Sequence, residues 1–148
     1  MKVWVDADAC PQVIKEIILR AIVKRAIPTI FVANKYLKLP ASNFITAVQV
    51  GAGADVADQY IAEHAVIGDL VITQDIPLAS ILVRKGINAI SVHGTLFTDA
   101  NIGERLAIRN FLQEIRDCGG KTQGPKPFND EGRQHFADAF DRELTKLL

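Results

Sequence analysis

The chain has few cysteines and histidines and no net charge. These three features argue against a disulfide, a zinc site and a large basic surface, in that order. Two cysteines, Cys10 and Cys118, are expected to be free thiols in a reducing compartment rather than a disulfide. The three histidines do not pair at metal-ligand spacing, so we expect them to be structural and no zinc site to form. A net charge of zero argues against a protein that coats nucleic acid with a large basic surface, but it allows a local basic rim around an acidic site.

Long apolar runs are also missing. No stretch is long enough to span a bilayer, and Met1–Asp6 reaches an acidic residue after a short apolar run, unlike a secretion signal. We therefore expect a cytoplasmic protein without a membrane partner. The 148 residues, of which 49% are hydrophobic and 23% charged, suit a single globular domain with one core. The oligomeric state is open.

Short apolar segments alternate with helical periodicity through the first two thirds of the chain. This predicts five strands, at residues 2–6, 29–33, 44–50, 70–73 and 88–92. The helices expected between them cover residues 11–25, 51–64 and 77–84. Such alternation is typical of a doubly wound α/β fold, with a mainly parallel sheet covered by helices on both faces. Residues 99–117 and 130–147 read as helices around a breaker-rich loop, so a C-terminal helical extension of about 99–148 completes the domain.

Five aspartates fall near the carboxyl ends of the predicted strands. Asp6 and Asp8 follow the first strand, Asp75 follows the fourth, and Asp55 and Asp58 share a face of the helix after the third. Open α/β sheets bind ligands at this edge. Converging carboxylates need a proton or a cation, and ligands made only of oxygen suit Mg²⁺ or Mn²⁺. These ions bind phosphate oxygens and activate water for displacement at phosphorus.

Some of these acids also have structural explanations. Asp8 could cap the first long helix, and Asp55 could simply sit favourably near a helix N-terminus. A carboxylate at a strand end gains little structurally, which favours a functional role for Asp6 and Asp75. Asp69 precedes its strand, so we expect it at the opposite edge as a turn residue.

Several motifs, in order, resemble the YaiI/YqxD family of bacterial proteins over nearly the whole chain. They are Val5-Asp6-Ala7-Asp8-Ala9-Cys10-Pro11, Gly53-Ala54-Asp55-Val56-Ala57-Asp58, Gly68-Asp69-Leu70-Val71-Ile72-Thr73-Gln74-Asp75-Ile76-Pro77-Leu78-Ala79 and Gly124-Pro125-Lys126-Pro127-Phe128. The resemblance implies the fold more firmly than the function.

The same motifs are more distantly similar to the PIN-like and NYN-type metal-dependent nucleases. That resemblance implies a single PIN-like domain in which Asp6, Asp55 and Asp75 bind the metal directly. Thr73 would be their hydroxyl partner, and Asp8 and Asp58 would be accessory acids. The implied activity is hydrolysis of phosphodiester bonds, with RNA as the expected substrate and Mg²⁺ or Mn²⁺ as cofactor.

A nuclease also needs cations that hold phosphates. Lys35 lies in the loop after the second predicted strand, at the same edge as the acids, and Lys126 lies between two prolines in a restricted backbone. We predict both as phosphate-binding residues. Arg105, Arg109 and Arg116 form a rough stripe on one predicted helix, which we interpret as a solvated or salt-bridged face.

Two other functions stay open. Asp6-Ala7-Asp8 has the spacing of the nucleophile and acid of an aspartate-nucleophile phosphatase, but Cys10 stands where a Thr or Val is usual and Asp69 is expected at the wrong edge. A non-catalytic module that binds nucleic acid or protein is the second alternative. The retained acids argue against that module, because a dead site has no reason to keep carboxylates that repel one another.

Overall fold

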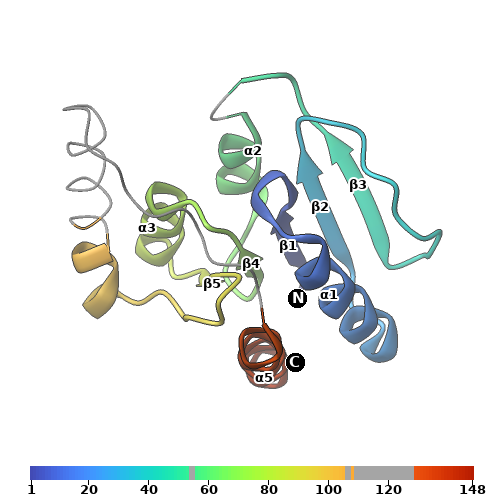
Figure 1. The fold of residues 1–148 in the computed structure, drawn as a ribbon. Coiled ribbons are helices and arrows are strands. Elements are labelled where there is room, and N and C mark those ends of the chain that lie inside the picture. The colour runs from blue at the N-terminus through green and yellow to red at the C-terminus, as the bar shows by residue number, and fades with distance from the viewer. Residues whose placement is uncertain (54–55, 106–107, 109–128) are drawn as a thin grey trace.

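The protein is built on a five-stranded, all-parallel sheet in the order β3-β2-β1-β4-β5 (Figure 1). The structure is a computed structural model that describes residues 1–53, 56–105, 108 and 129–148. The strands are β1 (Val3–Asp6), β2 (Thr29–Ala33), β3 (Ile45–Gln49), β4 (Leu70–Ile72) and β5 (Asn88–Ile90). The doubly wound α/β fold predicted from the sequence is therefore confirmed.

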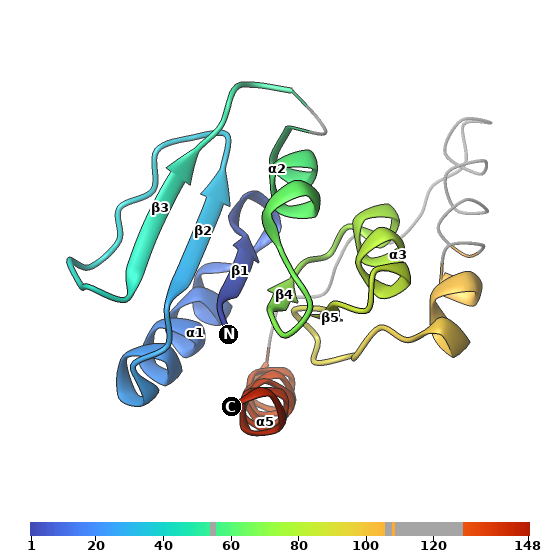
Figure 2. The same cartoon turned by 180° about the vertical axis from the view of Figure 1, so that it is seen from behind.

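Helices cover both faces of this sheet (Figures 1 and 2). The helices α1 (Gln12–Arg25) and α5 (Asp130–Leu147) contribute to the core on one face, and α2 (Val56–His64) and α3 (Ile76–Arg84) to the core on the other. A 3-10 turn, η1 (Ala7–Ala9), follows β1, and residues 99–105 are helical. None of the helices within the described residues has the length and apolarity that a membrane span requires.

Alternating side chains of each strand enter the two cores. Val3 and Val5 of β1 pack on the side of α1 and α5, whereas Trp4 packs on the side of α2 and α3. In β4, Val71 shares the side of Trp4. Because the side-chain period of a strand is two, Asp6 and Thr73 continue the rows of Trp4 and Val71 at the carboxyl edge.

The strand order reverses direction at β1. From β1 the chain proceeds outward through β2 and β3 on one side, and through β4 and β5 on the other. In an open α/β sheet the crevice at such a switch point is the usual ligand site. Here it lies between the carboxyl ends of β1 and β4, where Asp6 and Thr73 are found.

The predicted start of α2 was wrong. Residues 51–53 are not helical, and α2 is described from Val56. Gly53 has φ +148°, a backbone angle that side-chain-bearing residues rarely adopt and that is incompatible with an α-helix. Helical periodicity alone does not reveal such a break. The predicted helix at residues 99–117 falls largely outside the described residues.

Candidate functional site

The centre of the site is a hydrogen bond between two buried side chains on neighbouring strands. Val5 of β1 lies beside Ile72 of β4, so the next step of the parallel register brings Asp6 beside Thr73. The Thr73 hydroxyl donates to Asp6 Oδ2 at 3.0 Å, and the two residues are 1% and 6% exposed. The main chain of Thr73 is fixed in turn, because its N–H donates to the Ile90 carbonyl oxygen at 3.1 Å. Asp6 is thus held in one orientation.

Asp75 is joined to this pair through the same hydroxyl. The Asp75 N–H donates to Thr73 Oγ1 at 3.0 Å. Asp75 is also the N-cap of α3, since its Oδ1 accepts the Leu78 N–H at 2.8 Å. Our expectation that a strand-end carboxylate gains little structurally was therefore wrong for Asp75. One of its oxygens stabilises the helix start, and the other accepts no hydrogen bond from the described residues.

Asp8 lies in η1, exposed, close to the carboxyl end of β2. Its Oδ2 accepts the N–H of Asn34 at 2.9 Å. The predicted capping of α1 by Asp8 was wrong, because the N-cap is Pro11 and no side chain caps it. The bond to Asn34 brings the loop after β2, and with it Lys35, to the same edge of the sheet as Asp6. Sequence reasoning missed Asn34, because its contact is made by a backbone N–H that any residue but proline could supply.

Asp58 of α2 and Asp75 line a common pocket of about 330 Å³. Its other walls are Gln59, Ala62, Pro77, Leu78 and Ile81, from the facing sides of α2 and α3. The structure therefore brings Asp58 and Asp75 to one pocket, and the role of Asp58 as an accessory acid stays a prediction. Asp55, the expected third metal ligand, lies outside the described residues.

The electrostatics of the site centre on Asp6. Burial raises the pKa of the Asp6 carboxyl, and the nearby carboxylates of Asp75 and Asp8 raise it further, while the hydrogen bond from Thr73 lowers it. The net effect is a raised pKa of Asp6, so burial and repulsion outweigh the hydrogen bond from Thr73. The charged form of Asp6 would therefore be stabilised by a cation placed at this edge.

Two carboxylate oxygens of the site are available to such a cation. Among the described residues, Asp6 Oδ1 and Asp75 Oδ2 accept no hydrogen bond. Each of these oxygens could therefore act as a ligand without giving up a hydrogen bond seen in the described part of the chain. These oxygen donors fit Mg²⁺ or Mn²⁺. Within the described residues alone, no three acidic, histidine or cysteine side chains are grouped so that they could hold a metal ion.

Of the two predicted phosphate-binding residues, Lys35 lies within the described residues and Lys126 does not. Lys35 is exposed beside Asn34 at the carboxyl edge. Lys126 lies outside the described residues, as do Arg109 and Arg116. Arg105 lies over the ring of Phe97, 5.8 Å from its centroid, a cation–π contact that suits a structural role.

Asp69 lies at the opposite edge of the sheet, as predicted. It precedes β4, is 4% exposed, and accepts hydrogen bonds from Lys2 N, Trp4 Nε1 and Val66 N at 3.0, 3.0 and 3.1 Å. These three bonds join the start of β1 to the turn before β4. Asp69 is thus a structural acid, far along the strands from Asp6 and Thr73.

Cys10 and the histidines make contacts within the protein. Cys10 is buried, as predicted, and burial raises the pKa of its thiol to about 12. At neutral pH it is therefore a packed thiol and not a nucleophile. His64 bonds the Tyr60 carbonyl oxygen through Nδ1 and stacks on the Tyr60 ring, with centroids 4.0 Å apart. His135 contacts the carbonyl oxygen of His93.

The chain is similar to known proteins over nearly its whole length. The family described as "Uncharacterized BCR, YaiI/YqxD family" matches residues 4–146. The chain is 52% identical to a UPF0178 protein of Syntrophobacter fumaroxidans over 146 residues, 99% of this chain and 95% of the relative. It is 53% identical to a UPF0178 protein of Myxococcus xanthus over 148 residues, 100% of this chain and 97% of the relative. No solved structure matches it. The chain belongs to the YaiI/YqxD family.

Proposed function

We propose that this protein is a metal-dependent nuclease that hydrolyses phosphodiester bonds, with RNA as its substrate. The observation that carries the proposal is the buried Asp6 carboxylate at the switch point of the sheet, fixed by Thr73 and approached by Asp75 and Asp8. A fold gains no stability from such crowding of like charges. The arrangement makes sense if a cation neutralises it while the protein works.

In this proposal Asp6, Asp55 and Asp75 hold Mg²⁺ or Mn²⁺. The ion would bind a phosphate oxygen and lower the pKa of water, which is the chemistry that hydrolysis at phosphorus requires. Thr73 keeps the Asp6 carboxylate in a fixed orientation. Thr73 bonds one oxygen of Asp6, and the Leu78 N–H bonds one oxygen of Asp75, so the second oxygen of each carboxylate could serve as a ligand.

The other acids and the lysines would act around this centre. Asp8 is fixed by Asn34, and Asp58 lines the pocket beside Asp75, so both can accept hydrogen bonds from water or substrate hydroxyl groups. Lys35 follows Asn34 at the same edge and is exposed, which suits a contact to a substrate phosphate. Lys126 is proposed for the same role from the sequence.

The alternative functions are less well supported. For an aspartate-nucleophile phosphatase, the sequence suggested Asp69 as the further metal-binding aspartate, but Asp69 accepts three hydrogen bonds at the amino edge. A module that only binds nucleic acid or protein would gain nothing from Asp6, whose pKa is raised by burial and repulsion. The nuclease proposal uses both Asp6 and Asp75.

The test is cleavage of labelled single-stranded RNA in Mn²⁺ or Mg²⁺ by the wild type and by Asp6→Asn and Asp75→Asn. Both variants preserve the fold, because asparagine can still accept the Thr73 hydrogen bond and is itself a good N-cap. Asp138→Asn, an exposed acid on α5, is the matched control. We expect cleavage by the wild type and the control, and a loss of about 100-fold or more in the site variants. Equal cleavage by all four proteins, or none, would contradict the proposal.

A further inference from the structure

The helices α1 and α5 lie side by side, on the sheet face away from α2 and α3 (Figure 1). Between the two helices is a groove of about 660 Å³. This volume falls within the usual range of ligand pockets. The groove is defined by its lining residues Ile17, Arg20, Ala21, Lys24, Arg25, Asp130, Arg133, Gln134, Ala137, Phe140 and Asp141.

Apolar side chains from both helices line part of the groove. Ala21 of α1 and Ala137 of α5 are half-buried in its floor, together with Ile17. Alanine at these positions leaves unfilled the space that a larger side chain would occupy between packed helices. We call these half-buried apolar residues the floor of the groove, and its exposed charged residues the rim.

The rim of the groove is positively charged. Arg20, Lys24 and Arg133 are exposed, and none of them has an ion-pair partner among the described residues. Asp130 is the one rim carboxylate that is likewise unpaired in the described part of the chain. Around these four residues positive charge is therefore in excess, in a protein whose overall formal charge is zero.

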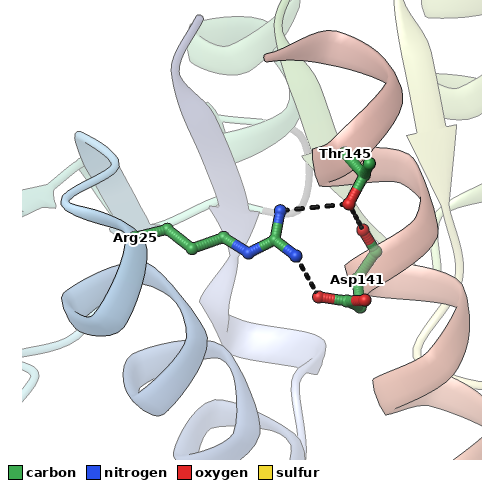
Figure 3. Close-up of polar contacts among 3 residues, drawn as sticks. All are labelled: Arg25, Asp141 and Thr145. Atoms are coloured by element: carbon green, nitrogen blue, oxygen red, sulfur yellow. Dashed lines mark hydrogen bonds and ion pairs between the residues drawn. The ribbon is translucent and has the colours of Figure 1, made fainter.

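Arg25 also lines the groove, but it is already paired within the protein. Arg25 donates through its two terminal nitrogens, to Thr145 Oγ1 at 3.1 Å and to Asp141 Oδ1 (Figure 3). The Thr145 hydroxyl donates in turn to the Asp141 carbonyl oxygen at 2.9 Å. These bonds hold the Arg25 guanidinium in place, and the Asp141 carboxylate balances its charge. The free positive charge of the groove therefore comes from Arg20, Lys24 and Arg133.

We infer that this groove binds a nucleoside phosphate, at a site separate from the aspartates at the carboxyl edge. The exposed arginines and lysine would contact the phosphates, because guanidinium groups match phosphate geometry with paired hydrogen bonds. The apolar floor of Ile17, Ala21 and Ala137 would receive the base and sugar, which carry no charge. The aspartate site lies on the other side of the sheet, where carboxylates would repel the same ligand in the absence of a metal.

The test is isothermal titration of the full chain with ADP in buffer that contains EDTA, so that no divalent ion can recruit ADP to the aspartates. We expect saturable binding of one ADP, and a loss of affinity of about tenfold for each of Arg20→Ala and Arg133→Ala. Arg142→Ala removes an exposed arginine of α5 that does not line the groove, and should leave the affinity unchanged. Adenosine, which lacks the phosphates, should bind at least tenfold more weakly than ADP.

A steric variant tests the groove independently of charge. Ala137→Leu fills the floor without altering any ionisable group and should abolish ADP binding. Fluorescence of the buried Trp4, on the other face of the sheet, reports whether each variant is folded. Absence of ADP binding to the wild type at millimolar concentration would overturn the inference, as would equal binding by folded Arg20→Ala, Arg133→Ala or Ala137→Leu. Binding of a short RNA at the groove with no binding of ADP would also overturn it, in favour of a surface for the RNA backbone.

Discussion

Asp69→Ala should be among the most destabilising single changes in this chain. Asp69 is 4% exposed, and its carboxylate accepts hydrogen bonds from two backbone N–H groups, of Lys2 and Val66, and from the indole of Trp4. Alanine removes all three acceptors at once. The Trp4 indole is then left without a partner in the core between the sheet and α2, where water has little access.

The size of the loss follows from these contacts. A hydrogen bond to a charged acceptor contributes about 1.5–3 kcal/mol, and a buried donor left unpaired costs about 1–3 kcal/mol. The bonds from Lys2 and Val66 are only partly buried, so water can replace part of what they lose. We therefore expect Asp69→Ala to lower the free energy of unfolding by about 3–6 kcal/mol, out of the roughly 5–15 kcal/mol that a domain has.

Urea unfolding followed by tryptophan fluorescence measures this loss directly. The chain has a single tryptophan, Trp4, which is itself one of the three donors, so its emission reports the site of the change. Asp138→Ala, in an exposed part of α5, is the control and should change stability by no more than about 0.5 kcal/mol. A loss below about 1 kcal/mol for Asp69→Ala would refute the assignment of Asp69 as the acid that joins the start of β1 to the turn before β4.

Three further predictions follow from individual contacts. Folding raises the pKa of Asp6. The stability that the protonated Asp6 carboxyl contributes is therefore fully present below pH 3.8, the pKa in the unfolded chain, and is lost as the pH rises through the pKa of the folded protein. Asp6→Asn should therefore raise the melting temperature of the metal-free protein at neutral pH, by about 2–4 °C for each kcal/mol added to the free energy of unfolding. Calorimetry at pH 4 and pH 7 should show a smaller increase at the lower pH. Thr73→Val removes the donor to Asp6 and the acceptor for Asp75 N–H, so urea unfolding should show a loss of about 2–3 kcal/mol that Thr73→Ser largely avoids. Gly94 has φ +85°, and a Cβ there would lie 2.9 Å from the His135 carbonyl oxygen, so Gly94→Ala should cost more than about 1 kcal/mol in the same assay.

The sequence was sufficient for the layout of the fold and for the edge where the acids gather. Apolar runs separated by helical periodicity predict parallel strands, and parallel strands bring their carboxyl ends to one edge. Asp6 and Asp75 could be placed at one edge on this basis, and Asp69 at the opposite edge. Thr73 was expected beside them only from the resemblance to PIN-like nucleases. The structure confirms these positions.

The partners of the acids could not be predicted in the same way. The bond of Asp8 to Asn34 spans 26 residues and depends on how the loop after β2 begins. The capping of α3 by Asp75 depends on where the helix starts, a boundary that periodicity fixes only to within a few residues. The groove between α1 and α5 depends on two helices far apart in the sequence packing side by side, so Ala21 and Ala137 could be recognised only in three dimensions.

The most direct test of the central claim is a titration of the metal-free protein with Mn²⁺ by calorimetry, since it needs no knowledge of the substrate. We predict saturable binding to the wild type and to Asp138→Asn, and a loss of affinity of about tenfold or more in both Asp6→Asn and Asp75→Asn. That result would establish that the acids at the carboxyl edge form a metal site. Absence of Mn²⁺ binding to the wild type, or equal binding by the Asp6→Asn and Asp75→Asn variants, would contradict it.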